Sequence, residues 1–458
     1  MKRFLLLTIA FIAFYVTRPL SAEGQTFPNF ALGGDSFTPS SSVVRTVNNQ
    51  KAIASYWDSG SRCYHLARVG LTDIISAKLD DHHDIADLRI VGDDIFFCGM
   101  DRSNYRAFLG HATVTGIESM TPHIEIMNFY VDNATITRLW RLAAYTDPTG
   151  ATRLVAVGDF WYTGSGLLNV PACPSPGTCQ STFAVECTYS SGNFNAIDNR
   201  VFYDNTNYEY ACDVVETDNY VAVVTFPAAD ELIIHPCDKN NMLALTSFGD
   251  YYRYKVPRSK VLFNGCRMKE DTIAVASVFN NGPGTDNMQV RVVDLATMNM
   301  PCAQTFDLKD KDDIYEMAYL PDIQRLVLLQ NQTYTPLTLL RHTFCFMKPY
   351  ETVFPYTMEK IYDINRRSFT SLDRLSSQHI VAAGGDCWIM KEVPNNNPAS
   401  TCYVTKTQPV KELSTSIPID ERYGFLRSNA PGIPSSCNEV YDSIGMNTGC
   451  KLHNNIAL

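Results

Sequence analysis

Short runs of aromatic and β-branched residues recur along the chain, separated by clusters of Asn, Asp, Gly and Pro. This rhythm is typical of β-strands joined by turns. Seven of the runs are almost continuously apolar, at 51–57, 94–99, 153–158, 220–225, 272–277, 325–330 and 379–384. A continuous apolar run predicts a strand with both faces covered, whereas an alternating run predicts one wet face.

The seven runs belong to similar segments. A polar turn precedes five of them, and another strand-like stretch follows each, at 65–69, 106–109, 182–185, 231–234, 288–293, 337–340 and 401–404. The segments start roughly 40 to 70 residues apart, slightly above the spacing of common propeller repeats. Because radial stacking of small sheets buries both faces of each, we expect an all-β fold, a β-propeller of seven blades over 23–405. Two or three unrelated β-sandwiches are the alternative.

One segment resembles a known group of proteins. Residues 87–99 (DLRIVGDDIFFCG), followed by 106–110 (RAFLG), resemble blades of secreted β-propeller-like repeat proteins of Bacteroidota, and 380–386 (IVAAGGD) is a fainter match. The resemblance extends loosely over 45–405 and implies a propeller fold. The group shares no activity, so the resemblance implies no catalytic residue, cofactor or ligand.

The first 22 residues have the layout of a secretory signal peptide. Lys2 and Arg3 precede an apolar run over 4–16, and Arg18-Pro19 then interrupts it before Leu20-Ser21-Ala22. The run is shorter than the roughly 20 residues of a membrane-spanning helix, and small residues suit a cleavage site. We therefore expect export to the periplasm, the cell surface or the medium, with an uncleaved anchor as the alternative.

Charge and hydropathy narrow the possible partners of the mature chain. Cleavage after Ala22 leaves 35 of the 38 basic residues against 48 acidic ones, which moves the net charge from -10 to -13. Nucleic-acid binding draws on clustered Lys and Arg, so no nucleic-acid partner is expected. No later stretch approaches membrane-spanning length, so no transmembrane segment is expected in the mature chain. We expect a monomer.

Fourteen cysteines, none at Cys-x-x-Cys spacing, favour disulfides in an exported chain. Three local pairs are predicted. Cys173 and Cys179 flank a turn, Cys387 and Cys402 lie almost symmetrically about 395–397 as hairpin partners would, and Cys437 and Cys450 lie in the C-terminal tail. Cys98 and Cys345 lie within apolar runs and fit buried small hydrophobic residues equally well.

The apolar rhythm ends near residue 405. Residues 406–458 are rich in Ser, Pro and Asn and contain the last cysteine pair. We expect this tail to pack on the propeller, as a strap over one face or across the closure of the ring. A sorting or attachment tail is the alternative.

The densest polar cluster is 80–84 (DDHHD), in which His82, His83 and Asp84 offer metal-ligand types. Neighbouring residues on a strand point to opposite faces, so His82 and His83 would share an ion only on a loop. We interpret the cluster as a solvated loop and expect no metal. The acidic stretch 307–313 lacks the Gly and Glu of an EF-hand calcium loop, and it is interpreted as an exposed turn.

Catalytic motifs give no positive assignment. Gly-x-Ser-x-Gly, a phosphate-binding loop and a dinucleotide fingerprint are all missing from the sequence, and no cofactor is expected. The preferred hypothesis is a non-enzymatic binding or adhesion propeller that recognises a glycan or a protein. The alternatives are a propeller-fold glycoside hydrolase or polysaccharide lyase, and a structural component of a surface assembly. Two carboxylates about 5 to 10 Å apart at the channel mouth would favour the hydrolase.

Overall fold

The computed structural model describes residues 30–31 and most of 43–392, with short interruptions of which 164–177 is the longest. Beyond 392 it describes 403–406, 422–423 and 435–439. The predicted signal peptide over 1–22 lies outside the described residues. Among the described residues, no helix is long and apolar enough to cross a membrane.

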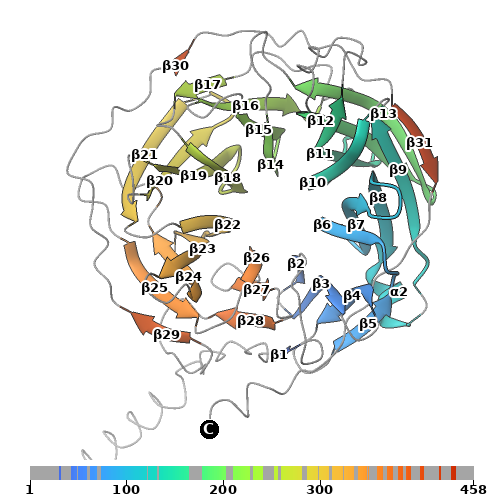
Figure 1. Cartoon of the computed structure of the whole chain (residues 1–458), viewed down its shortest axis with the longest axis horizontal. Helices are drawn as coiled ribbons and strands as arrows, with labels where there is room; N and C mark the ends of the chain where they lie inside the picture. The colour runs from blue at the N-terminus through green and yellow to red at the C-terminus, as the bar shows by residue number, and fades with distance from the viewer. Residues whose placement is uncertain are drawn as a thin grey trace, which may run out of the picture.

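The described strands form seven antiparallel sheets of four or five strands each. The sheets are arranged around a common centre, with one strand of each nearest to it (Figure 1). Each sheet is named here after that innermost strand. The innermost strands are β2 (Val43–Asn48), β6 (His83–Val91), β10 (Ala134–Thr146), β14 (Tyr210–Glu216), β18 (Ser259–Arg267), β22 (Asp312–Leu320) and β26 (Phe369–Arg374).

The seven apolar runs form the second strand of each sheet, as the sequence predicts. These strands are β3 (Lys51–Asp58), β7 (Asp94–Asp101), β11 (Thr152–Thr163), β15 (Tyr220–Phe226), β19 (Thr272–Asn280), β23 (Arg325–Tyr334) and β27 (Ile380–Gly384). The third strands are β4 (Cys63–Val69), β8 (Arg106–Thr113), β12 (Thr178–Ser190), β16 (Glu231–Asp238), β20 (Asp286–Asp294), β24 (Leu339–Met347) and β28 (Trp388–Glu392).

The outer strands complete the sheets. Six of them follow in chain order: β5 (Ile74–Lys78), β9 (Glu125–Val131), β13 (Asn193–Phe202), β17 (Tyr252–Lys255), β21 (Asn299–Leu308) and β25 (Met358–Ile364). The β26 sheet instead takes its outer strand from the N-terminal side of the chain, because β1 (Phe30–Ala31) pairs with β28. A short helix, α2 (Val114–Glu118), joins β8 to β9 and begins at the N-cap Thr113.

Three strands from the C-terminal part of the chain add fifth members to the outer edges of other sheets. β29 (Tyr403–Lys406) pairs with β25, β30 (Arg422–Tyr423) pairs with β17, and β31 (Ser435–Glu439) pairs with β9. The prediction that 401–404 is the returning strand of the seventh repeat is therefore wrong: β28 has that place, and β29 belongs to the β22 sheet. The local pattern of a hairpin does not specify which sheet a strand joins.

The hydrophobic core lies between neighbouring sheets. Phe96 and Leu109 of the β6 sheet pack with Leu154 and Phe183 of the β10 sheet, and all four are buried. Similar clusters lie between the β2 and β6 sheets, the β10 and β14 sheets, and the β14 and β18 sheets. Because each such sheet is covered on both faces, its second strand is apolar on both faces, which explains the continuous runs.

Five innermost strands contain a β-bulge at an equivalent place. The register with the second strand shifts between Ile85 and Asp87, Leu139 and Arg141, Ala211 and Asp213, Ile314 and Glu316, and Phe369 and Ser371. A bulge inserts one unpaired residue and re-aims the side chains beside it. The residue after each bulge is polar, in strands that are otherwise largely apolar.

Glycines on the second strands make room for the bulges. Gly99 lies opposite Ile85, Gly158 opposite Leu139 and Gly384 opposite Phe369, each at the residue where the register shifts. A Cβ atom at Gly158 would overlap the carbonyl oxygen of Arg138. The backbone of the bulged strand therefore approaches its neighbour more closely than any side chain would permit.

We expect Gly158→Ala to lower the free energy of unfolding by about 3 kcal/mol, because the new methyl group meets backbone that cannot rotate away. Gly150→Ala is the matched control. Gly150 has φ +87° with open space around it, so this change adds only the strain of a left-handed residue, about 1–2 kcal/mol. Urea denaturation measures both. Equal losses would show that close approach at the bulge is unimportant.

Candidate functional site

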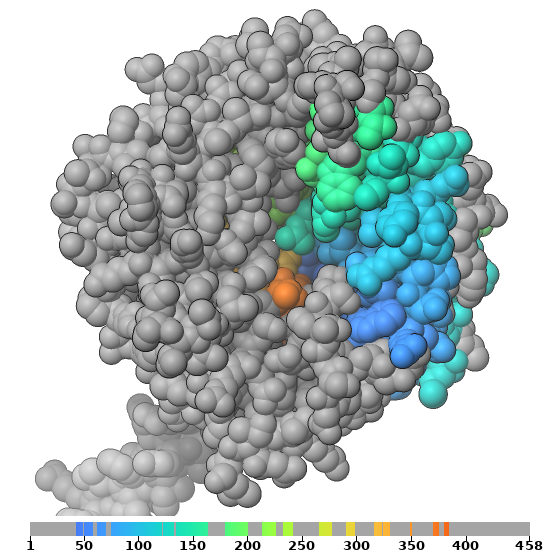
Figure 2. Space-filling model, in the orientation of Figure 1, coloured from blue at the N-terminus to red at the C-terminus, as the bar shows by residue number. Residues whose placement is uncertain are grey.

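One cavity of about 380 Å³ is lined by residues of all seven innermost strands. The lining residues lie in the middle and toward the C-terminal end of these strands, from Arg45 and Thr46 of β2 round to Asp373 and Arg374 of β26. The molecular surface is hollowed near its centre in the view along the same axis (Figure 2). Contacts join each innermost strand to the next along the chain, and β26 to β2.

Asp87, the residue after the β6 bulge, is a buried hub for three of the innermost strands. Its Oδ1 atom accepts hydrogen bonds from Arg45 Nη2 at 2.6 Å and Arg89 Nη1 at 2.7 Å. Its Oδ2 atom accepts the backbone N–H of Leu142 on β10 at 3.0 Å. Burial opposes ionisation, but Arg89, Arg45 and Arg141 outweigh it, so the pKa of Asp87 is lowered.

Glu316, the residue after the β22 bulge, forms a second hub. It pairs with Arg45, and its Oε2 atom accepts hydrogen bonds from Ser371 Oγ at 2.6 Å and from the backbone N–H of Leu372 at 2.7 Å. Ser371 Oγ also accepts the backbone N–H of Val44 at 3.1 Å. Burial lowers the pKa of Arg45, but Glu316, Asp87 and Asp373 together raise it, so the guanidinium stays charged.

Two further carboxyl groups in the lining have raised pKa values. Asp213 accepts the backbone N–H of Gly265 at 2.7 Å and pairs with Arg141 at 3.7 Å, yet burial dominates and raises its pKa. Asp373 accepts the backbone N–H of Thr46 at 2.7 Å, and burial likewise raises its pKa despite Arg45. A cavity carboxyl group with a raised pKa is a candidate for proton transfer.

A common rule unites these bonds. In four places a side-chain carboxylate on one innermost strand accepts a hydrogen bond from a backbone N–H of the next innermost strand around the centre. The acceptors and donors are Asp87 and Leu142, Asp213 and Gly265, Glu316 and Leu372, and Asp373 and Thr46. These residues were not predicted from the sequence. A signal was nevertheless present in the sequence. A polar residue stands shortly before the turn that leads into the apolar run, and in three repeats this run ends in glycine.

Two groups in the cavity lining have hydrogen-bonding capacity that the described residues do not satisfy. Arg374 is exposed, and no hydrogen bond or ion pair of its guanidinium is found within the described part of the chain. The hydroxyl of Thr46 is buried and has no hydrogen-bond partner among the same residues. The exposed Arg374 guanidinium can bond to a ligand in the cavity without breaking an existing bond.

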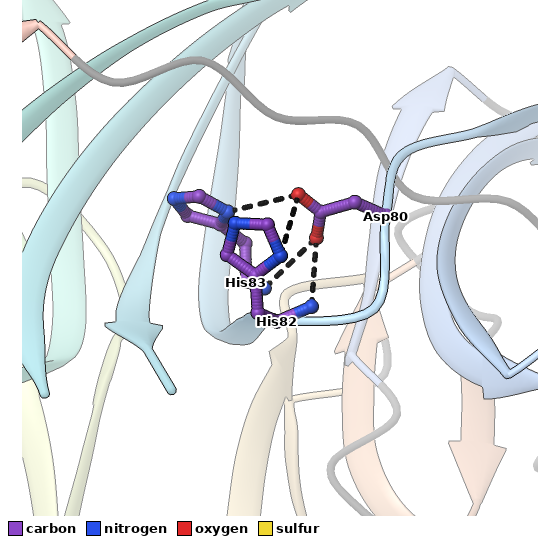
Figure 3. A group of neighbouring side chains, drawn as sticks. All are labelled: Asp80, His82 and His83. Atoms are coloured by element: carbon purple, nitrogen blue, oxygen red, sulfur yellow. Dashed lines mark hydrogen bonds and ion pairs between the residues drawn. The ribbon is translucent and has the colours of Figure 1, made fainter. Parts of the chain in front are cut away.

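The metal-ligand types predicted from the sequence lie elsewhere: His82 is in the loop between β5 and β6, and His83 and Asp84 are the first two residues of β6. The structure brings His82 and His83 together, with ring centroids 4.7 Å apart. Asp84 is turned away and pairs with Arg102 at 2.6 Å. The carboxylate of Asp80 lies beside both rings, with its Oδ2 atom 3.1 Å from His83 Nδ1 and 3.4 Å from His82 Nδ1 (Figure 3). Asp81 Oδ1 lies 3.0 Å from His82 Nδ1.

The cysteines divide into several groups. Cys98 and Cys266 are buried free thiols, and burial raises the pKa of each, so a disulfide at every cysteine is not found. Cys179 is disulfide-bonded, and its pairing with Cys173 stays a prediction because Cys173 lies outside the described residues. Cys387, Cys402 and Cys450 also lie outside them, and the side chain of Cys437 is not described. The hairpin behind the pair Cys387–Cys402 does not form, since β28 and β29 join different sheets.

Comparison with known proteins gives no family. No protein-family model and no curated protein matches the sequence. Among solved structures, the chain is similar to the polysaccharide lyase Uly1, with 11% identity and a TM-score of 0.45 over 82% of this chain and 94% of the other. The chain is also similar to Chaetomium thermophilum Raptor, with 9% identity and a TM-score of 0.46 over 83% of this chain and 30% of the other. A third similar structure is prolyl oligopeptidase B from Galerina marginata, with 10% identity and a TM-score of 0.41 over 86% of this chain and 52% of the other.

The central ion pairs generate a stability prediction. Asp87→Asn should lower the free energy of unfolding by about 3–5 kcal/mol at pH 7, because it takes one of two paired carboxylates from the buried Arg45 and removes the carboxylate that pairs with the half-buried Arg89. Asp84→Asn is the control on the same strand. Its pair with Arg102 is partly exposed, so this change should cost less than about 1 kcal/mol.

The difference in stability between the native protein and Asp87→Asn should depend on pH. The folded-state pKa of Asp87 is lowered, so its stabilising contribution is complete above the unfolded value near 4 and is lost as the pH falls through the folded value. The stability gap between the native protein and Asp87→Asn should therefore narrow below about pH 4. Denaturant titrations at pH 7 and pH 3 measure it. A gap that is constant with pH would contradict the charge-based role.

Proposed function

We propose that the protein is an exported seven-bladed β-propeller that binds a glycan in the cavity at its centre. The observation that carries the proposal is a cavity to which every innermost strand contributes. Its volume falls within the range of about 300–1,000 Å³ found for small-molecule sites. The order of contacts from β2 through β26 and back to β2 supports the propeller.

The chemistry of the lining favours a hydroxyl-rich ligand. Both guanidinium groups and carboxylates line the cavity, among them Arg89, Asp213, Arg267 and Asp373. Hydroxyl groups donate to carboxylates and accept from guanidinium groups, so a saccharide satisfies both kinds of side chain. The exposed Arg374 guanidinium provides hydrogen-bonding capacity that the described part of the chain leaves unused.

A binding role, without catalysis, is supported by the hydrogen bonding of the hubs. Each carboxylate oxygen of Asp87 already accepts at least one hydrogen bond, and both oxygens of Glu316 are engaged. Groups fixed in this way hold the innermost strands in place and have little freedom to transfer protons.

A glycoside hydrolase or polysaccharide lyase is the second candidate. The specific observation in its favour is the pair Asp213 and Asp373, two cavity carboxyl groups whose pKa values are raised by burial. A raised pKa keeps a carboxyl group protonated closer to neutral pH, as a general acid requires.

A glycan array probed with the purified mature protein tests the proposal. We expect binding to a defined set of glycans. Arg374→Ala should weaken binding of the best ligand at least tenfold, as measured by calorimetry. Lys269→Ala is the control, because Lys269 is an exposed cation in the turn after β18 and lies outside the cavity lining. Binding that is unchanged in Arg374→Ala, or capture of peptides alone on a parallel peptide array, would overturn the glycan site.

The same glycans distinguish the second candidate. Incubation with the native protein should leave them intact if the protein only binds. Shortened products that disappear with both Asp213→Asn and Asp373→Asn would establish the enzyme instead. Retained binding by these folded variants would show that the loss concerns chemistry.

Export is tested by the N-terminus of the secreted product. Expression of the full chain in a bacterial host should yield a mature protein beginning at Glu23, identified by mass spectrometry. A product that retains residues 1–22 in the membrane fraction would show an anchor in place of a cleaved signal peptide.

A further inference from the structure

We propose that Asp80, His82 and His83 bind one divalent transition-metal ion, with zinc the best match, where the loop after the β2 sheet enters β6. This site lies apart from the central cavity, and none of its three residues lines that cavity. The proposal does not depend on the proposed glycan binding.

The three ligand atoms already have the spacing of a metal site. Asp80 Oδ2 lies 3.1 Å from His83 Nδ1 and 3.4 Å from His82 Nδ1, and all three atoms lie within 4.8 Å of one another (Figure 3). Zinc bonds of about 2.0–2.2 Å in a tetrahedron separate ligand atoms by about 3.3–3.5 Å. An ion therefore fits between these atoms with only small side-chain movements.

The loop is held in this shape by its own backbone. Asp80 Oδ1 accepts the backbone N–H groups of His82 at 3.0 Å and of His83 at 2.9 Å, which leaves Oδ2 facing the imidazoles. The backbone of Asp80 accepts a hydrogen bond from Tyr64 N at 2.6 Å, and that of His82 accepts one from Arg102 N at 2.8 Å. The ligands are therefore positioned before any ion binds, which lowers the entropic cost of binding.

A buried carboxylate stands behind the inner ligand. His83 is completely buried, and its ring meets the edge of Phe108 at 4.6 Å between centroids. His83 Nε2 points toward Asp101 Oδ2 at 4.0 Å, and this buried oxygen accepts no hydrogen bond within the described part of the chain. Histidine ligands commonly direct their second N–H to such a carboxylate, which fixes the ring orientation and strengthens the metal bond.

One placement of the ring hydrogen on His83 favours a cation between the ligands. If His83 carries its hydrogen on Nε2 toward Asp101, a neutral ring presents the Nδ1 lone pair to the Asp80 carboxylate. Two lone pairs repel, so in this form a positive charge between them is stabilising, whereas a hydrogen on Nδ1 would be donated to Asp80 Oδ2. A proton can bridge only one nitrogen–oxygen pair, whereas one metal ion satisfies Asp80, His82 and His83 together.

The donor set and the access route indicate the type of ion. Two imidazole nitrogens and one carboxylate oxygen suit zinc and its first-row neighbours better than calcium or magnesium, which prefer oxygen ligands. The side chain of His82 is 32% exposed, so the ion can enter from solvent and keep a water or another ligand in its fourth position.

Calorimetry on the untagged mature protein, dialysed against a chelator and titrated with ZnCl₂, tests the site. We expect one equivalent to bind, and CoCl₂ in place of zinc should give the visible absorption of a four-coordinate ion. His82→Ala and Asp80→Asn should each weaken zinc binding at least tenfold. Asn at position 80 keeps an oxygen that can accept the two loop N–H bonds, so its folding should match the native protein in the presence of chelator.

His123→Ala is the matched control. His123 is an exposed histidine that pairs with Glu125 at 3.2 Å, and its replacement should leave zinc binding unchanged. Asp101→Asn should weaken binding by a smaller factor than Asp80→Asn, as expected of a positioning residue. Absence of stoichiometric binding in the native protein, or native affinity in both His82→Ala and Asp80→Asn, would overturn the proposal in favour of a protonated His83.

Discussion

The hydrogen bond from a backbone N–H on one innermost strand to a carboxylate on its neighbour is the interaction on which the centre of this molecule depends. An innermost strand pairs with its sheet along one side only, so its other side presents unpaired N–H and C=O groups. Neighbouring innermost strands belong to different sheets and do not pair as a ladder. Asp87, Asp213, Glu316 and Asp373 satisfy donors of the neighbouring strand in four places, and buried backbone groups demand such partners.

These carboxylates also explain why arginines gather at the centre. Buried negative charge is costly unless it is paired, and Arg45 and Arg89 offset the charge of Asp87. The resulting network crosses from β22 and β26 to β2 and β6, which joins the last sheet in the chain to the first two. The same charged groups give the cavity its polar lining, so the features that hold the sheets together also determine which ligands the proposed site can accept.

Much of the sheet structure could be predicted from the sequence, because continuous apolar runs such as those that form β7 and β11 report directly that both faces are buried. The seventh returning strand could not be assigned, since pairing of β1 with β28 and of β29 with β25 links segments far apart in the chain. The central carboxylates were missed because a charged residue within a strand is ordinarily exposed, and only a bulge turns it inward. In the loop cluster, His82 and His83 were found, but Asp84 was chosen over Asp80 because sequence proximity does not reveal the turn that Asp80 makes.

The pairing of β1 with β28 has a consequence for the order in which the molecule assembles. Synthesis delivers Phe30 and Ala31 long before their partners Ile389 and Trp388. The first sheets can form from local hairpins as they emerge, while the N-terminal strand must wait for nearly the whole chain. Contacts between segments so distant in sequence are slow to form. Until then β1 has no partner strand, so this segment must be protected from pairing with other molecules during that interval.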